Sequence, residues 1–254
     1  MSTRVNKTLP AKRVSSKQHA SFPIVGIGAS AGGLETLQLF FSKMSPETNT
    51  AFVIIQHLSP NFKSIMASLL AKYTRMTVCE IEDGMILAKN CVYLNPPNKN
   101  VAIFNRTLHL MAPVKSSAIN MPIDFFFRSL SEDQKEKAIG IIVSGTASDG
   151  TLGIKAIKAE GGMVMAQDPD TAKYDGMPRS AIGTGLVDFI LAVEKMPDAL
   201  ISYVKHPFLK SPGKINVSQS NVQHQLQKVV FQRILQACLL EGFLSASISN
   251  IFCC

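Results

Sequence analysis

Three short segments of this sequence carry residue types that hydrolytic enzymes use for nucleophilic attack. The segments are Gly26–Gly33 (GIGASAGG), Gln56–Pro60 (QHLSP) and Ser144–Gly150 (SGTASDG). They supply a hydroxyl in Ser30, an imidazole in His57 and a carboxylate in Asp149. A serine nucleophile, a histidine base and an acid that orients the histidine make a hydrolytic triad. The residue types therefore suggest hydrolysis, provided that the fold brings the three segments together.

Each segment follows directly on an apolar run with the length and composition of a buried strand. The runs are Ile24–Val25, which begins a strand expected over Ile24–Gly28, then Ala51–Ile55 and Ala138–Val143. Strand and helix patterns alternate from about residue 22 to 206, which predicts a doubly wound α/β fold with a mainly parallel sheet and helices on both faces. The carboxyl ends of such strands meet at one crevice, where ligands bind. The serine, the histidine and the aspartate are therefore expected on one rim.

Hydrophobic periodicity and turn residues predict the other elements. Leu34, Leu37, Phe40 and Phe41 would share one face of a helix after the first strand. Apolar runs at 101–104 and 107–111 flank a short turn, which predicts a small antiparallel hairpin at one edge of the sheet. Further strands are expected at 78–81, 92–94 and 163–166, and further helices at 64–73, 123–130, 150–160 and from residue 176.

The glycine loop fits two patterns. Gly26 to Ala31 matches the dinucleotide pattern G-x-G-x-x-G/A, and Gly28 to Gly32 matches the nucleophile elbow G-x-S-x-G, with Ser30 at its centre. A dinucleotide site needs an acid about 20 residues later, at the end of the second strand, to hold the ribose. The sequence has Gln56 and His57 there, so the elbow is favoured and a nucleotide-dependent oxidoreductase is disfavoured.

His57 and Asp149 each have a structural alternative. A single histidine after a strand is more often structural than catalytic, and an Asp-Gly pair after a strand commonly caps the following helix. Their expected place beside Ser30 favours the catalytic interpretation, in which the acid fixes the histidine tautomer. Asp168, Asp170 and Asp175 in the next loop are alternative acids.

Composition limits the possible partners. The net charge of +8 comes from the ends, because residues 21–204 carry 16 cations against 17 acids. Nucleic-acid binding by the body of the chain is therefore not expected. No apolar stretch is long enough to span a bilayer, and no secretory signal is seen. The five cysteines show no metal-ligand or disulfide spacing, which predicts a cytoplasmic protein.

Three regions are expected along the chain. Residues 1–21 have the composition of a flexible basic tail, and residues 22–208 would form the catalytic domain. Residues 209–254 would be a linker followed by a helical segment outside the core, since Leu226, Val229, Val230, Ile234 and Leu235 could share one helix face.

The three motifs together resemble the catalytic domain of chemotaxis-type protein-glutamate methylesterases. The likeness extends from about Pro23 to Val204. It includes further matching blocks in the same order, which are Glu82–Gly84, Val92–Pro97, Ala166–Asp168 and Gly176–Arg179.

The resemblance implies Ser30 as nucleophile, His57 as general base and acid, and Asp149 as the carboxylate that orients it. The implied reaction hydrolyses glutamate γ-methyl esters on chemotaxis receptors, releases methanol and uses no metal or organic cofactor. Deamidation of receptor glutamines by the same groups is also implied. The residues expected to contact substrate or shape the cleft are Ala31, Gly32, Thr146, Gln167, Met177 and Arg179.

The sequence departs from the family pattern in three respects. The family often has threonine at the position of Ala31 and methionine at that of Thr146. Residues 1–22 are too short for the receiver domain that family members commonly carry, so a separate receiver or methyltransferase partner is possible. Residues 215–254 would then be the start of a continuation. These departures leave an alternative open, a catalytically weak module that docks receptors or a signalling complex.

Overall fold

The computed structural model describes residues 22–58, 65–113 and 120–205. Seven parallel strands form the main sheet, in the spatial order β10-β9-β8-β1-β2-β5-β3. Their bounds are β1 Ile24–Ala29, β2 Ala51–Gln56, β3 Thr77–Glu80, β5 Cys91–Leu94, β8 Ala138–Ile142, β9 Met163–Gln167 and β10 Phe189–Leu191. The chain runs outward from β1 in one direction and later returns to build the other half from β8. The strand order therefore reverses between β1 and β8, where ligands bind in folds of this type.

A second sheet holds three antiparallel strands in the order β4-β7-β6. These are β4 Met85–Ile86, β6 Asn100–Phe104 and β7 Thr107–Met111. The α-helices are α1 Gly33–Lys43, α2 Met66–Leu70, α3 Pro122–Gln134, α4 Thr151–Ala159, α5 Gly176–Ile182 and α6 Met196–Lys205. Three 3-10 turns occupy Lys135–Lys137, Pro169–Thr171 and Val193–Lys195.

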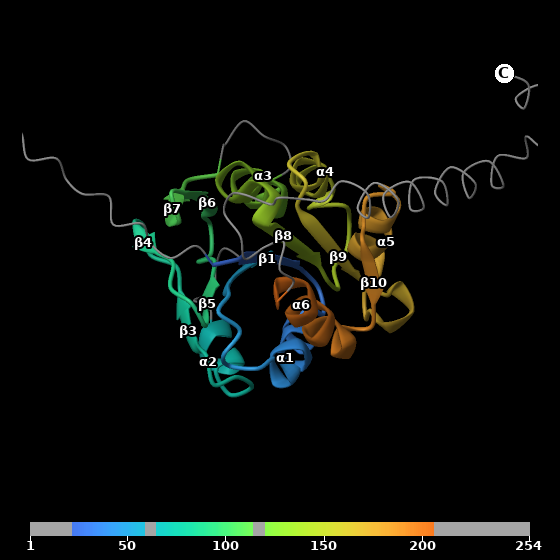
Figure 1. The fold of residues 1–254 in the computed structure, drawn as a ribbon, viewed down its shortest axis with the longest axis horizontal. Helices are drawn as coiled ribbons and strands as arrows, with labels where there is room; N and C mark the ends of the chain where they lie inside the picture. Colours follow the sequence, from blue (N-terminus) through green and yellow to red (C-terminus); the bar gives the residue numbers. More distant parts are fainter. Residues whose placement is uncertain (1–21, 59–64, 114–119, 206–254) are drawn as a thin grey trace, which may run out of the picture. The chain divides into compact units, whose positions relative to one another are not determined.

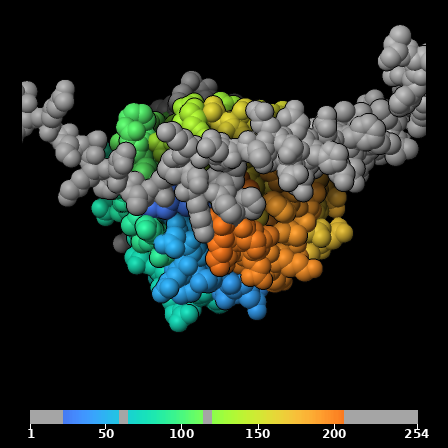
Figure 2. All heavy atoms as spheres, in the orientation of Figure 1, coloured from blue at the N-terminus to red at the C-terminus, as the bar shows by residue number. Residues whose placement is uncertain are grey.

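Helices cover both faces of the main sheet (Figure 1). The helices α1, α2 and α6 pack on one face through apolar side chains such as Phe41, Leu70 and Met196. The helices α3, α4 and α5 cover the other face, together with the second sheet. Figure 2 shows α1 and α6 side by side on the molecular surface, and contacts between the two helices agree with this view. Two apolar layers therefore enclose the sheet, as its alternating side chains require.

The two central strands carry glycine on the face that α3 covers. A Cβ at Gly26, Gly28 or Gly140 would lie within 3.0 Å of an apolar side chain of α3 or α4. At Gly28 the nearest atom is Cγ2 of Ile123, only 2.6 Å away, in the first turn of α3. Because these strand positions have no side chain, the start of α3 lies directly against the end of β1.

The predicted fold class is confirmed: a mainly parallel sheet, helices on both faces and a small antiparallel sheet. The hairpin forms as predicted, but it pairs with β4 in a sheet of its own and does not extend the edge of the main sheet. The helix expected at 64–73 is shorter, since α2 has five residues. The elements β4, β10 and α6 were not predicted, because each is short or begins without a clear capping signal.

Several sequence-based expectations lie outside the described residues. They concern the basic tail at 1–21, Ser59 and Pro60 of the histidine segment, and the helical segment within 209–254. Within the described ranges, no helix is both long and apolar enough to cross a membrane.

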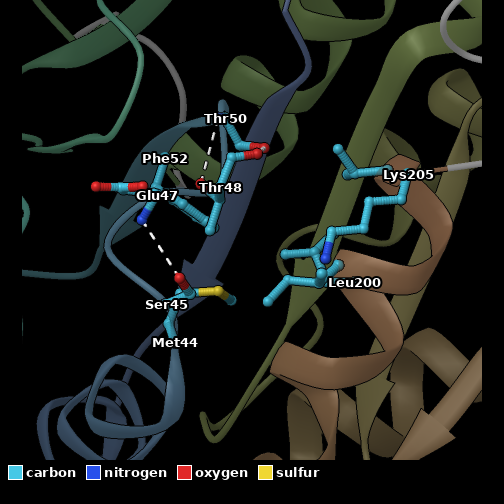
Figure 3. A pocket seen from close by; sticks show the side chains of 10 residues that line it. Met44, Ser45, Glu47, Thr48, Thr50, Phe52, Leu200 and Lys205 are labelled. Carbon is cyan, nitrogen blue, oxygen red and sulfur yellow. Dashed lines mark hydrogen bonds between the residues drawn. The ribbon is translucent and has the colours of Figure 1, made fainter.

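A small hollow of about 50 Å³ lies at the amino end of β2 (Figure 3). Its walls come from residues between Met44 and Phe52, which follow α1, and from residues between Leu200 and Lys205 of α6. The three motif segments follow the opposite, carboxyl ends of the strands. This hollow therefore has no part in bringing the triad residues together.

We expect Gly28→Ala to destabilise the protein by about 1–3 kcal/mol, because the added methyl group would push α3 away from the sheet. The free energy of unfolding from urea titration measures the effect. The double variant Gly28→Ala/Ile123→Ala should lose less than the sum of the two single variants, because removing the Ile123 branches makes room. A Gly28→Ala variant as stable as the parent would contradict the close approach of α3.

Candidate active site

The three motif segments leave the sheet side by side, and backbone hydrogen bonds continue past the strand ends. The N–H of Ser30 donates to the carbonyl of Ser144 at 3.0 Å, and the N–H of His57 donates to the carbonyl of Ala29 at 3.3 Å. These bonds place the first residues after β1, β2 and β8 on one rim. The rim includes the point between β1 and β8 where the strand order reverses.

The serine, the histidine and the aspartate form a continuous hydrogen-bonded chain. Ser30 Oγ lies 3.1 Å from Nδ1 of His57, and Nε2 of His57 lies 2.8 Å from Oδ2 of Asp149. The histidine side chain is one-third exposed, whereas the aspartate side chain is 1% exposed. The acid is thus buried, whereas the exposed His57 and the half-buried Ser30 can be reached from solvent.

The hydrogen bonds define which nitrogen of His57 can act as a base. An ionised Asp149 only accepts hydrogen bonds, so Nε2 of His57 must carry a proton to bind it. In neutral imidazole the other nitrogen then has a free lone pair. That nitrogen, Nδ1, faces Ser30 Oγ. The acid thus selects the tautomer that can take the serine proton.

Asp149 is held by the start of α3. Its Oδ1 accepts the N–H of Asp124 at 2.9 Å, and its Oδ2 accepts the N–H of Ile123 at 3.0 Å. Both donors are unpaired N–H groups of a helix amino terminus, which carries partial positive charge. The alternative that Asp149 caps the helix after Gly150 is wrong, because Gly150 is the N-cap of α4 and has no side-chain cap.

Ser144, which sequence reasoning did not single out, ties the serine loop to its neighbours. It is fully buried, and its hydroxyl donates to the carbonyl of Ala31 at 2.9 Å and accepts the N–H of Tyr174 at 3.1 Å. Its backbone N–H donates to Oε1 of Gln167 at 2.9 Å. Ser144 therefore links the loops after β1, β8 and β9. Its only sequence signal was its place in the Asp149 loop.

Asn95 performs a similar task beside His57. Its side-chain amide donates to the carbonyl of Gln56 at 3.0 Å and accepts the N–H of Gln56 at 2.8 Å. These two bonds fix the peptide groups immediately before His57. The Asn-Pro-Pro-Asn run around Asn95 indicated a turn, and its partner could not be inferred without the fold.

The serine loop also presents backbone N–H groups. Those of Ser30 and Gly33 are used internally, by the carbonyls of Ser144 and Ser30. In the part of the chain that the structure describes, the N–H groups of Ala31 and Gly32 have no acceptor. Gly32 has a φ of 71°, which favours glycine, and is the N-cap of α1. These two N–H groups are available to bind an anionic oxygen.

The residues expected to contact substrate differ in exposure. Ala31 and Gly32 lie in the serine loop, and Thr146 is exposed in the Asp149 loop. Gln167 is 2% exposed and its amide is used internally, since Nε2 donates to the carbonyl of Thr171 at 3.1 Å.

Met177 and Arg179 lie in the same short helix and face different environments. Met177 is 1% exposed and packs against Gly145, where a Cβ would meet both the Met177 sulfur and Ser30. Arg179 is exposed and donates to Asp175. Exposure therefore suits Thr146 and Arg179 for direct contact, whereas Gln167 and Met177 support the loops. A substrate contact remains a prediction for each.

The alternative acids do not bond to His57 in the described structure. Asp168 accepts the N–H of Asp170, and Asp175 accepts from Arg179.

A cavity of about 190 Å³ borders Gly32 and is lined in part by Gln167, Lys173 and Glu35. Among the described residues, no group of three or more histidine, cysteine, aspartate or glutamate side chains is arranged to hold a metal ion.

Comparisons with known proteins identify the family of the chain. The family model described as CheB methylesterase matches residues 25–200. A protein-glutamate methylesterase/protein-glutamine glutaminase of Burkholderia thailandensis is 32% identical over 81% of this chain and 60% of its own length. A putative enzyme of the same name from Leptospira interrogans is 31% identical over 71% of this chain and 94% of its own length.

A longer relative and a solved structure add to these matches. An uncharacterized 104.1 kDa protein of Rhodobacter capsulatus is 44% identical over 55% of this chain, which spans 14% of that protein. The chain thus covers less than two thirds of the length of the Rhodobacter and Burkholderia relatives. The crystal structure of the Thermotoga maritima CheB methylesterase catalytic domain aligns with a TM-score of 0.67 and 33% identity, over 72% of this chain and 99% of that one. The chain therefore belongs to the CheB methylesterase family.

Proposed function

We propose that the chain hydrolyses glutamate γ-methyl esters on chemotaxis receptors and releases methanol. The observation that carries the proposal is the hydrogen-bonded chain from Ser30 Oγ through His57 to the buried Asp149. Family membership and the names of the relatives, protein-glutamate methylesterase/protein-glutamine glutaminase, support the substrate class.

In the first half of the reaction, Ser30 Oγ attacks the ester carbonyl and His57 Nδ1 takes the hydroxyl proton. The imidazolium that forms is stabilised by the carboxylate of Asp149, which two backbone N–H groups of α3 hold in place. His57 then gives the proton to the departing methoxide. Methanol leaves, and the glutamyl group remains on Ser30 as an ester.

In the second half, His57 Nδ1 removes a proton from a water molecule that attacks the same carbonyl carbon. Collapse of this intermediate returns the proton to Ser30 Oγ and frees the glutamate side chain. A glutamine side chain would follow the same course, with ammonia as the first leaving group. This is the deamidation that the names of the relatives imply.

The N–H groups of Ala31 and Gly32 are the proposed donors to the negative oxygen of the intermediate. The carbonyl of Ala31 and the N–H of Gly32 belong to one peptide group, and in a trans peptide they point in opposite directions. Because the hydroxyl of the buried Ser144 donates to this carbonyl, the N–H of Gly32 points away from Ser144. One such donor is worth about 3–4 kcal/mol in the transition state.

Three wider expectations belong to the same proposal. Residues 22–208 would be the catalytic domain, flanked by the tail at 1–21 and the segment 209–254. A receiver or methyltransferase unit would act as a partner, whether separate or joined to this chain. The site of action would be the cytoplasm, where the methylated glutamates of receptors lie.

We expect Ser30→Ala to reduce methanol release from methylated receptor by at least about 1,000-fold, because the nucleophile is lost while the fold is kept. Gas chromatography of methanol gives the rate. Ser42→Ala is the matched control, since Ser42 is an exposed serine whose hydroxyl donates only to the carbonyl of Leu39. Equal rates for Ser30→Ala and the parent would rule out the serine mechanism.

Asp149→Asn should lower the labelling rate of Ser30 by a fluorophosphonate by about 10⁴-fold. An asparagine amide that donates to His57 Nε2 would force the proton onto Nδ1, which then cannot accept from Ser30. Asp168→Asn, in the loop after β9, serves as the control and should label like the parent. A parent protein that resists the reagent would favour the docking module without turnover.

A further inference from the structure

A second buried carboxylate lies beside the site and has no part in the reaction described above. Asp124, in the first turn of α3, is 4% exposed. Its Oδ1 accepts the N–H of Gly153 at 2.7 Å. Its Oδ2 is buried and has no hydrogen-bond partner. A buried carboxylate oxygen without a partner costs stability and calls for an explanation.

Asp124 and Asp149 cross-connect two helices. Asp149, just before α4, accepts the N–H groups of Ile123 and Asp124 in α3. Asp124, in α3, accepts the N–H of Gly153 in the first turn of α4. The carboxylate of Asp149 thus accepts N–H groups at the amino terminus of α3. The carboxylate of Asp124 does the same at the amino terminus of α4. The side chain of Asp124 accepts a hydrogen bond from α4, and its backbone N–H donates one to Asp149. Asp124 therefore connects α4 to the carboxylate of Asp149.

The arrangement brings two acids close together in a buried place. Burial raises the pKa of Asp124, and the charge of Asp149 raises it further, while the N–H groups of Gly153 and Leu152 and the cation of Arg128 act in the opposite direction. Asp149 from the loop after β8 and Arg128 from α3 are the charged groups acting on it, and His57 lies beyond Asp149. A neutral acceptor would cap α4 with less electrostatic cost.

We propose that Asp124 is a positioning residue, which fixes the start of α3 to α4 and thereby aims Asp149 at His57. The proposal rests on the proposed function of the Ser30 site. Without the bond to Gly153, the first turn of α3 loses its side-chain hydrogen bond to α4. The Ile123 and Asp124 N–H groups would then no longer hold the Asp149 carboxylate in the plane that faces Nε2 of His57. We expect the negative charge of Asp124 to favour the imidazolium as well.

Two variants separate the hydrogen bond from the charge. Asp124→Ala removes both, and we expect kcat for methanol release to fall about tenfold with KM unchanged, because the triad loses alignment rather than substrate contacts. Asp124→Asn keeps an oxygen for the N–H of Gly153, so kcat should stay within about threefold of the parent. Loss of its charge should move the acid limb of the pH–rate profile to lower pH by about half a unit, since the imidazolium is less stabilised.

Asp133 provides the matched control. It lies near the end of the same helix and accepts the backbone N–H of Arg106 at 3.4 Å, away from the triad. Asp133→Ala and Asp133→Asn should change the melting temperature without changing kcat or the acid limb. If Asp133→Ala lowers kcat as much as Asp124→Ala, or if the acid limb of Asp124→Asn coincides with that of the parent, the positioning role is wrong.

Two further readouts keep this test independent of the proposed function and of folding. The rate of fluorophosphonate labelling of Ser30 reports the aligned triad without any receptor, and an NMR titration of the His57 ring reports the charge effect without turnover. A parent that neither releases methanol nor labels would overturn the proposed function. An unchanged His57 midpoint in Asp124→Asn would overturn the inference. If Asp124→Ala does not fold, Asp124→Asn alone decides between these outcomes.

Discussion

The carboxylate of Asp149 is the point on which the site depends. Its two oxygens meet a histidine ring nitrogen and two N–H groups at the amino terminus of α3, while its side chain is almost wholly buried. A buried charge needs such partners, because an unpaired one would be neutralised or would destabilise the fold. These three hydrogen bonds compensate for the burial of the carboxylate. The bond to His57 also selects the histidine tautomer.

The position of α3 follows from the small residues beneath it. Gly26, Gly28 and Gly140 leave the centre of the sheet without side chains on the α3 face. Phenylalanine rings and Ile123 fill this space, so that the first turn of α3 reaches the end of β1. The core and the site are therefore not separate parts of the molecule. A side chain added at Gly28 would meet Ile123, whose N–H donates to Asp149.

A second group of buried polar contacts shapes the serine side of the rim. Ser144 joins three loops, and Asn95 fixes the peptides that precede His57. Each of these side chains forms at least two hydrogen bonds to backbone groups of other segments. The loops of the rim are therefore held by these side chains as well as by backbone hydrogen bonds past the strand ends. Among the described residues, the N–H groups of Ala31 and Gly32 have no acceptor.

The sequence by itself determined the strand–helix alternation, the ends of the main strands and the three segments that follow them. These are local properties, because apolar runs and glycine turns report on neighbouring residues. Ser30, His57 and Asp149 could be nominated since all three follow strands whose ends must converge. Only the tertiary structure decided that Asp149 binds α3 instead of α4, that the hairpin pairs with β4, and that Ser144, Asn95 and Asp124 matter. Those contacts join residues far apart in the chain, and no local pattern encodes which distant N–H group a side chain will meet.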